Sequence, residues 1–359
     1  MRVVILGAGV VGVATAWHCL WAGHEVTVVD RQPGAGLETS FANAGQLSYG
    51  FASPWAGPGV PLKALKWLAM KHRPLVLWPR PDPDMLRWLW RMLANCNAPS
   101  FAVNRARMLR LAEYSKVALV SLRQATGIAY DGQGRGTLQL FRTPEQMEAA
   151  LRDSPALAAA GIEHEVVDAE GCIAAEPALA LVRERLAGGL RVPGDETGDA
   201  HLFTQRLAAL CAAGGVVFRY GTTVAGIATE GGRASGVVTA GGVIAADAVV
   251  VAAGSYSTAL LRPLGVSIPV YPVKGYSLTI PVEDAAAAPV STVMDETYKV
   301  GITRLGDRIR VGGTAELAGF STRLRAPRRA APRWKPPSPP CSRRAATRRR
   351  ACSGPGSGR

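Results

Sequence analysis

The residues best suited to chemistry stand at the start of the chain, where three glycines are spaced to hold a diphosphate. Gly7, Gly9 and Gly12 form the pattern G-x-G-x-x-G directly after a run of β-branched residues. In this pattern the first glycine permits a tight turn, the second lets the backbone approach a pyrophosphate, and the third lets a helix pack closely on a strand. The free N–H groups at the helix start would face the phosphate charge. The spacing therefore predicts a dinucleotide site, although such glycines also occur where they only tighten an α/β turn.

Asp30 ends the next β-branched run and gives the predicted site a carboxylate. That group would accept hydrogen bonds from a ribose diol and repel a 2′-phosphate, which leaves FAD or NAD as the dinucleotide. A loop of small and polar residues follows at 38–46. Its hydroxyl and backbone groups could reach the pyrophosphate and leave room for a bulky ring system, but the residues alone do not choose between the two cofactors.

The elements around these residues predict an α/β fold with mixed α+β character. A strand at 2–6, a helix reaching Ala22 and a strand at 24–30 make a βαβ unit of the size that binds a mononucleotide. A long helix is expected at 101–126 from its apolar spacing. Short β runs separated by glycines between 216 and 254 predict a hairpin insertion that returns to a buried sheet. Further strands are predicted at 136–141, 276–280, 298–303 and 308–312.

Composition excludes several classes of protein. With 359 residues, 48% of them hydrophobic, the chain can bury a large core. The formal charge of +14 is concentrated at the end, because residues 317–359 hold twelve basic and no acidic side chains. Residues 1–316 carry 29 basic and 27 acidic groups. The basic segment is poor in apolar residues, so we expect it to be disordered. A solvated extension is favoured over phosphate binding, and no specific nucleic-acid partner is expected.

Cysteine and histidine usage indicates a reduced compartment and no metal. The six cysteines are scattered without a C-x-x-C pair, which is typical of reduced cytosolic thiols. The five histidines form no ligand-spaced pair, so no metal site is predicted. Residues 3–23 lack charged side chains and superficially resemble a signal peptide or membrane span. The three glycines favour the strand–turn–helix interpretation instead.

The chain as a whole resembles the small subunit of FAD-dependent D-amino-acid dehydrogenases, within the D-amino-acid oxidase and glycine oxidase group of flavoproteins. The resemblance runs almost continuously from Met1 to about Arg329. The segments that carry it include ILGAGVVGVATAW, VVDRQPG, ETSFANAGQ, YPVKGYSLTIP, DETYKVGITR and RVGGTAE.

The resemblance implies a cofactor, a reaction and a domain plan. It implies FAD, and oxidative deamination of D-amino acids, with D-alanine favoured and the electrons passing to a membrane quinone or another acceptor. An NAD-linked enzyme on the same nucleotide fold is the alternative. A Rossmann-like FAD-binding domain is expected at 1–54 and 186–265, interleaved with a mixed-sheet substrate domain at 55–185 and 266–325, before a tail at 326–359. The expected FAD contacts are Val3, Val4, Ile5, Leu6, Gly7, Ala8, Gly9, Val10, Val11, Gly12, Asp30, Arg31, Thr39, Ser40, Asn43, Ala44, Gly45, Val224 and Gly254.

Four residues are candidates for the substrate pocket. Oxidation of an amino acid by a flavin needs a neutral amine, a Cα–H directed at the cofactor, and a cation or phenol that fixes the carboxylate. Lys274, Tyr276, Tyr298 and Arg304 have suitable side chains on predicted strands or turns. Tyrosine and arginine on strands are, however, more often surface or packing residues. Gly254 ends a buried strand, where close approach of a cofactor is favoured over simple turn formation.

The last segment departs from the family pattern. The family continues with a G-L-R-P-x-T-x-D-G type motif, whose arginine is expected to hold the substrate carboxylate, and with a glycine-rich segment that completes the flavin site. After Arg329 the chain turns instead into a sequence rich in Arg, Pro and Ser. We interpret this change as a frameshift product that would leave activity weak or absent and stability poor. Resequencing the gene tests the interpretation.

A tryptophan-rich stretch suggests a surface role. Five of the eight tryptophans lie between residues 55 and 90, and residues 55–91 hold seven Lys/Arg against two Asp. Such a composition suits an element that lies on an anionic bilayer. A tryptophan-rich helical cap over the substrate pocket is slightly favoured as the explanation. The expected location is the cytoplasm, with peripheral contact with the cytoplasmic face of the inner membrane.

Overall fold

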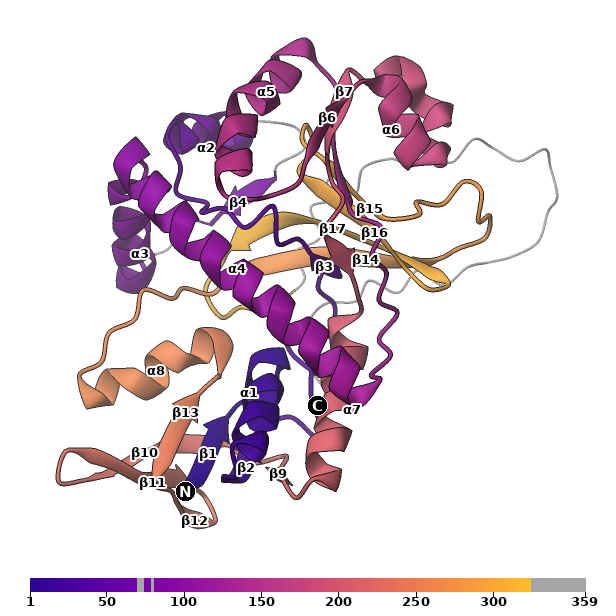
Figure 1. The fold of residues 1–359 in the computed structure, drawn as a ribbon. Coiled ribbons are helices and arrows are strands. Elements are labelled where there is room, and N and C mark those ends of the chain that lie inside the picture. Colours follow the sequence, from indigo (N-terminus) through magenta and orange to yellow (C-terminus); the bar gives the residue numbers. More distant parts are fainter. Residues whose placement is uncertain (70–73, 79–80, 324–359) are drawn as a thin grey trace.

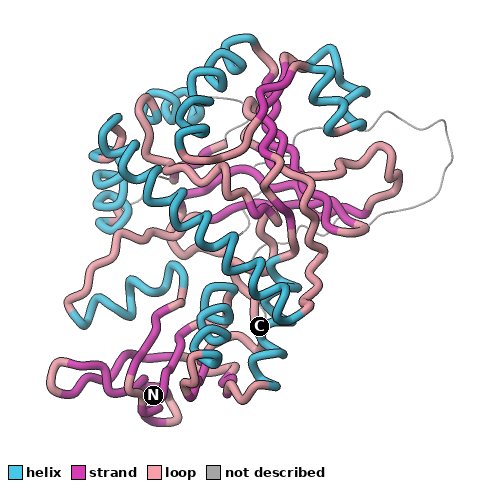
Figure 2. Tube along the Cα trace, viewed as in Figure 1, coloured by secondary structure: helices cyan, strands magenta, loops and turns pink. Residues whose placement is uncertain are grey.

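The computed structural model describes residues 1–69, 74–78 and 81–323. They form a parallel sheet covered by a small meander, a larger mixed sheet, a two-stranded ladder, and a long helix that bridges the two halves (Figures 1 and 2). The predictions for 326–359 lie outside the described residues. None of the helices in the described residues is long and apolar enough to cross a bilayer. Within the same ranges, no three His, Cys, Asp or Glu side chains are grouped so that they could hold a metal ion.

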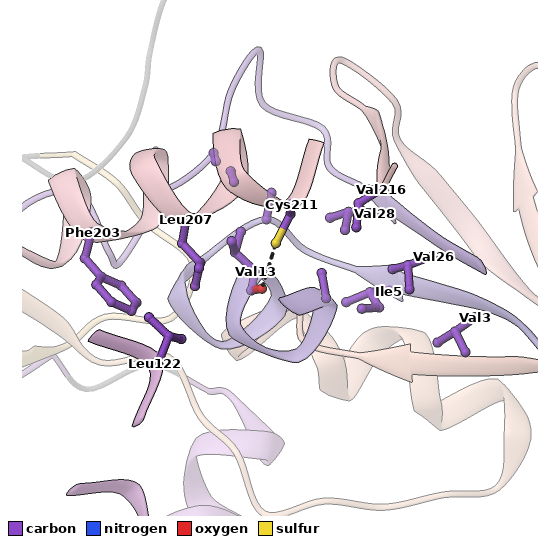
Figure 3. Packing of buried hydrophobic residues seen from close by; sticks show 14 of the residues in the cluster. Val3, Ile5, Val13, Val26, Val28, Leu122, Phe203, Leu207, Cys211 and Val216 are labelled. Atoms are coloured by element: carbon purple, nitrogen blue, oxygen red, sulfur yellow. Dashed lines mark hydrogen bonds between the residues drawn. The ribbon is translucent and has the colours of Figure 1, made fainter. Parts of the chain in front are cut away.

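The first sheet is parallel and contains the N-terminal βαβ unit. Its order is β13 (Ala248–Val251), β1 (Arg2–Leu6), β2 (Glu25–Val29) and β9 (Val217–Arg219). One face is covered by α1 (Val10–Trp21) and α7 (Ala200–Ala213), where Val13 and Leu207 are completely buried (Figure 3). Because β1 is covered on both faces, it reads as a continuous apolar run, as buried parallel strands do. The predicted βαβ unit is confirmed.

A meander covers the other face of the parallel sheet. It consists of β10 (Val224–Glu230), β11 (Arg233–Thr239) and β12 (Gly242–Ala245), paired antiparallel. Val237 packs there against Val4, Leu6 and Val29. The chain then returns through β13, which lies at the edge of the parallel sheet beside β1, and continues into η2 (Gly254–Tyr256), α8 (Ser257–Leu261) and η3 (Arg262–Leu264). The predicted hairpin insertion is confirmed.

The second sheet is larger and mixed. Its order is β14 (Lys274–Pro281), β17 (Arg308–Leu317), β16 (Val300–Leu305), β15 (Thr292–Asp295), β5 (Thr137–Phe141), β7 (Gly188–Val192) and β6 (Glu165–Val167), with β4 (Leu75–Leu77) beside β17. Among the pairs formed by the described residues of this sheet, β15–β5 and β17–β4 are parallel and the others are antiparallel. The helices α5 (Pro144–Ala159), α6 (Ala169–Ala175) and η1 (Pro177–Arg185) lie at the β6–β7 end (Figure 1). These mixed sheets confirm the predicted fold class.

The helix α4 (Ala98–Thr126) bridges the two halves. It runs diagonally across the molecule in Figure 1, and its Leu109 is buried in the core beside the second sheet while Leu122 is buried beside the first. Asn97 caps its start by accepting a hydrogen bond from the Ser100 N–H, and Gly127 ends it in a left-handed conformation. The remaining helices before it are α2 (Val60–Ala69) and α3 (Pro83–Ala94). A short ladder of β3 (Gln46–Leu47) and β8 (Glu196–Thr197) also connects the halves.

One strand lies in a different sheet from the one that the expected domain ranges assign to it. Strand β7 lies within 186–265, the range expected for the FAD-binding domain, but it pairs with β5 and β6 in the mixed sheet. Its residues, Gly-Gly-Leu-Arg-Val, are compatible with either sheet, so the sequence carries no sign of this pairing. The exact domain boundaries stay a prediction.

Candidate active site

The glycine turn between β1 and α1 is built so tightly that side chains are excluded. Gly7 adopts φ +110°, and a Cβ on it would lie 2.5 Å from the Ala252 carbonyl oxygen. A Cβ on Gly12 would lie 1.8 Å from the Gly7 carbonyl oxygen. At Gly9 the nearest atom to such a Cβ is the Ser40 hydroxyl, at 3.5 Å, so the backbone there is open to a ligand. The first turn of α1 carries no acidic residue, so no negative side chain would repel an anion bound at the helix N-terminus.

Asp30 lies directly beside the glycine turn. Its Oδ2 accepts a hydrogen bond from the Ala8 N–H at 2.6 Å, and its Oδ1 accepts one from the Gln32 N–H at 2.7 Å. An ionised carboxylate offers about four lone-pair sites, so both oxygens keep capacity for further donors. Asp30 is therefore a fixed acceptor beside the glycine turn.

The loop after β2 contributes further groups to the same place. The Ser40 hydroxyl accepts a hydrogen bond from the Val10 N–H at 3.0 Å and so joins the loop to the start of α1. Thr39 is exposed. Arg31 forms an ion pair with Glu38 and lies 3.9 Å over the Tyr256 ring. Burial alone would lower the pKa of Arg31, but hydrogen bonds to Tyr256 and Glu38 raise it above its usual value.

The end of this loop is bound to the mixed sheet. Ser277 of β14 donates a hydrogen bond to the Ala42 carbonyl at 2.9 Å, and Arg310 of β17 donates one to the Asn43 carbonyl at 3.1 Å. The Asn43 side chain accepts from the Gly45 N–H, which fixes the turn. The loop that begins beside the dinucleotide fingerprint thus ends against the second sheet.

A charge cluster supports this connection. Asp199 caps the start of α7 and accepts a hydrogen bond from Arg308 at 2.8 Å, while Arg310 lies 3.8 Å away. Burial alone would raise the pKa of Asp199, but the hydrogen bond from Arg308 and the charge of Arg310 outweigh burial and hold the pKa below its usual value. Asp199 and Arg310 are both buried. The cluster joins a helix of the parallel-sheet half to a strand of the other half.

A cavity of about 240 Å³ opens where the loop meets the sheet. Two glycines form part of its wall: a Cβ on Gly301 would lie 2.6 Å from Gln46 Nε2, and one on Gly312 would lie 3.2 Å from Ala44 Cβ. The cavity is small for a ligand site, since pockets for drug-sized molecules begin at about 300 Å³. Its lining residues are Ala44, Gln46, Met294, Asp295, Glu296, Lys299, Val300, Gly301 and Gly312.

Comparison with known proteins identifies the family. A family model described as FAD dependent oxidoreductase matches residues 2–352. The chain belongs to this family. It is 67% identical over 331 residues to the D-amino acid dehydrogenase of Methylobacterium sp. (strain 4-46), covering 92% of this chain and 79% of that protein. It is 60% identical over 329 residues to the D-amino acid dehydrogenase of Rhizobium johnstonii, with the same two coverages. The resemblance inferred from the sequence is confirmed.

Solved structures agree with this assignment. Glycine oxidase from Geobacillus kaustophilus superposes with a TM-score of 0.63 at 27% identity, covering 90% of this chain and 74% of that one. L-proline dehydrogenase from P. horikoshii superposes with a TM-score of 0.65 at 18% identity, covering 89% and 71%. The second likeness shows the fold alone.

The residues of this FAD-dependent oxidoreductase fit the cofactor. The tight turn at Gly7 and Gly12, the open backbone at Gly9 and the carboxylate of Asp30 would hold the diphosphate and ribose of FAD. The choice that the fingerprint left open between FAD and NAD is resolved for FAD by the family. FAD supplies the redox chemistry when bound, and the protein supplies binding and orientation.

Among the other expected FAD contacts, Val3, Val4, Ile5 and Leu6 are buried inside β1, so their side chains belong to the core. Val224 is half-buried against Leu6 and Val29, two residues after Thr222, whose N–H donates to the Asp30 carbonyl. Gly254 follows β13 with φ +53°, and a Cβ on it would meet no atom within 4 Å. Its backbone conformation therefore favours glycine, whereas crowding by the protein does not require it. The FAD contacts stay predictions as individual residues.

The four substrate-pocket candidates are not brought together. Ser277 and Thr279 of β14 bond to Ala42 and Arg310, so Lys274 and Tyr276 lie on the opposite face of the strand by the alternation of side chains. There the Lys274 ammonium pairs with Glu316 at 3.1 Å, and the Tyr276 hydroxyl donates to the same carboxylate.

The other two candidates lie apart from this pair. Tyr298 is in the turn between β15 and β16, with the Arg142 guanidinium 5.2 Å over its ring. The Arg304 Nε donates to the Gly306 carbonyl at the β16–β17 hairpin. Their roles at the substrate stay predictions.

The sequence reasoning missed most of the cavity. In the sequence Gln46 is only the end of a polar loop, and no motif marks Lys299, Gly301 or Gly312. The glycine pair at 312–313 inside a strand could have indicated close backbone approach. No sequence signal marks Lys299, because its left-handed φ of +53° is known only from the structure.

Proposed function

We propose that the protein catalyses FAD-dependent oxidative deamination of D-amino acids, with D-alanine as its favoured substrate. The D-amino acid dehydrogenases at 60–67% identity support the substrate class. The observation that carries the proposal is the small cavity between the loop of the FAD fingerprint and the glycine-lined sheet. Its size suits a small side chain.

The reaction balances with water and an electron acceptor. The Cα–H bond of the neutral amino acid gives up a hydride, the amine loses a proton, and the resulting imino acid reacts with water to give a 2-oxo acid and ammonia. FAD, which Gly7, Gly9, Gly12 and Asp30 would hold, would supply the two-electron redox chemistry, and a quinone or another acceptor would take the electrons. The protein contributes a site that positions Cα and excludes bulk water.

A visible spectrum tests this proposal. Purified protein reconstituted with FAD should absorb near ~450 nm and bleach on anaerobic addition of D-alanine but not of L-alanine. Bleaching by neither enantiomer, with FAD bound, would favour a catalytically impaired remnant. Failure to bind FAD would contradict the cofactor site as well.

We further propose that the protein works on the cytoplasmic face of the inner membrane, held by an apolar-basic surface on α2 and α3. Some tryptophans of the 55–90 stretch contact the rest of the protein. The Trp67 ring lies 6.0 Å from the Lys299 ammonium, and Trp88 packs near Tyr271. Trp55 and Trp90 are exposed. Both helices are drawn at the left of Figure 1. The apolar-basic surface consists of exposed Trp55, Leu62, Leu65, Leu86, Trp90 and Leu93 with Lys63, Lys66, Arg87 and Arg91.

Flotation with liposomes tests this surface. Replacing Lys63, Lys66 and Arg91 with glutamine should reduce binding to phosphatidylglycerol vesicles, because each basic residue near an anionic surface contributes about 1 kcal/mol. Arg233 and Arg219, replaced with glutamine on the opposite half, are the matched controls. Unchanged binding of the first variant would count against the interfacial role and favour the cap. Lys71, Arg73 and Arg80 lie outside the described residues.

A further inference from the structure

We propose that the protein forms a two-fold symmetric dimer through the face shared by α1 and α4, with a second copy of this chain as the partner. The face carries a ridge of exposed apolar side chains and, beside it, a groove that such a ridge can enter. The proposal concerns assembly and does not depend on the reaction that the protein catalyses.

The groove lies between the C-terminal halves of α1 and α4, which are neighbours in Figure 1. It encloses about 340 Å³. Trp17 and Trp21 form one wall, one helical turn apart on α1, with ring centroids 5.5 Å apart. Ala118, Ser121 and Ala125 of α4 recur at helical spacing, and their small side chains leave the groove open. The other lining residues are His18, Tyr114, Val117 and Leu122.

The ridge lies on the same face of α4, closer to the start of the helix. Leu111, Tyr114 and Val117 form it, and their exposed fractions are 66%, 72% and 64%. Together with Trp21, exposed to 68%, they present roughly 500 Å² of largely apolar surface, whereas each partner in a standard interface buries about 800 Å². An apolar patch of this size usually marks an interaction site. The ridge and the groove together are therefore large enough for the central part of a dimer interface.

The ridge and the groove are complementary under a two-fold rotation. With the axis midway between Tyr114 and Ala118 and the two α4 helices antiparallel, Tyr114 lies against Ala118 of the second copy. In the same arrangement Leu111 lies against Ser121 of the second copy. A large side chain thus meets a small one at each level, and the symmetry repeats every contact, as in an isologous interface.

The charges on this face agree with the antiparallel arrangement. Arg107 comes to Ala125 in the last turn of the second copy's α4, which ends at Gly127. The carbonyl groups of a last turn form the negative end of the helix dipole and favour a cation. The ends of the helix pair are therefore attractive.

A second copy fits this face better than the chain's own tail or a bilayer does. Residues 325–359 contain no Val, Ile, Leu, Met or Phe, so the tail has little apolar surface with which to fill the groove. A bilayer would cover the exposed ridge, but it has no rigid projection that matches the groove. A second copy supplies both the projection and the groove.

Sedimentation velocity of the full chain from about 1 to about 100 μM tests the proposal, because interfaces of this size dissociate in the micromolar range or below. The wild type should be a dimer that dissociates on dilution. In Ala118→Arg the new side chain fills the groove, and the dissociation constant should rise at least about a hundredfold. Leu111→Ser should raise it about tenfold. Leu151→Ser on α5, where the leucine is 55% exposed, is the matched control.

Tryptophan fluorescence gives a second readout. Association buries Trp21, so the emission of the wild type should shift to shorter wavelength with increasing concentration. Trp21→Phe should lose most of this shift, whereas Trp90→Phe, which removes a tryptophan with an exposed fraction of 73%, should keep it. Far-UV circular dichroism and urea unfolding check that each variant keeps its fold.

Three results would overturn the proposal. The first is a monomer at about 100 μM, and the second is a dimer whose dissociation constant is the same in Ala118→Arg as in the wild type. The third is a monomer that floats with phospholipid vesicles and loses this binding in Leu111→Ser, which would assign the face to a bilayer.

Discussion

The two ends of the candidate active site differ in what holds them. At the parallel sheet the groups are backbone N–H groups and one carboxylate, all within the contiguous unit β1–α1–β2. At the mixed sheet the groups are side chains from segments far apart in the chain, such as Gln46 and Lys299, and their meeting depends on the register of β3, β16 and β17. A site made of backbone can be recognised from a local motif, whereas a site made of side chains requires knowledge of which face each residue occupies.

The largest effect is expected from filling the glycine turn. In Gly12→Ala the new Cβ would lie 1.8 Å from the Gly7 carbonyl oxygen, so the α1–β1 contact must open. We expect a loss of more than about 3 kcal/mol in the free energy of unfolding and little bound FAD. Urea unfolding and the absorbance at ~450 nm measure the two quantities. Gly226→Ala is the control, since no heavy atom lies within 4 Å of its Cβ position. Full FAD content in Gly12→Ala would show that FAD binding does not depend on the tight glycine turn at the parallel sheet.

The next effect concerns a buried acid on the mixed-sheet side. Asp195 precedes β8, and its Oδ1 accepts a hydrogen bond from the Gly50 N–H at 2.9 Å, while its Oδ2 has no partner among the described residues. Burial raises the pKa of Asp195 from 3.8 to about 6, although hydrogen bonds from Gly50 and Thr137 oppose the shift. The folded state therefore holds the proton more tightly than the unfolded state does. Stability should fall as pH rises from about 4 through 6, and the penalty should be complete about one pH unit above the raised pKa.

Asp195→Asn removes this penalty. The variant keeps an oxygen for the Gly50 N–H but cannot ionise, so we expect a gain of about 3 kcal/mol at pH 8 and almost none at pH 4. Urea unfolding at both pH values measures the difference. The exposed Asp153→Asn should shift stability by less than about 0.5 kcal/mol at either pH. A gain that is independent of pH would contradict the titration and indicate a packing effect.

A smaller effect is expected where the two halves meet. Arg310→Met removes the donor to the Asn43 carbonyl and to the Thr279 hydroxyl, while Arg308 remains as a partner for Asp199. The unpaired groups should cost about 1–3 kcal/mol of stability and weaken FAD binding through the loosened loop. Titration with FAD and thermal unfolding check both, with the exposed Arg135→Met as control. If Arg310→Met lowers stability but leaves FAD affinity unchanged, the loop does not depend on this contact.

The sequence predicted the elements well and the substrate side poorly. The βαβ unit, the helix at 101–126 and the strand at 308–312 each follow from a local pattern, and the structure contains all three. The side-chain chemistry of Lys274 and Tyr276 predicts a substrate role, but a strand places alternate residues on opposite faces. Only the contacts of Ser277 and Thr279 show which face meets the FAD loop. No pattern in the sequence reveals that Gln46 and Lys299 line one cavity, because their distance depends on non-local pairing.

The smallest effect should come from Arg304→Met. Arg304 is paired with Ile309 on the face of β16 opposite to Thr303 and Leu305, and its Nε bonds to the Gly306 carbonyl at the hairpin. Since it does not line the cavity, kcat and KM for D-alanine should each change less than about twofold and stability by less than about 0.5 kcal/mol. Steady-state kinetics beside Lys299→Met in one preparation give the direct contrast. A large rise in KM for Arg304→Met would show that Arg304 contacts the substrate, as the sequence predicts, and that the cavity is not the substrate site. An effect confined to Lys299→Met would show the reverse.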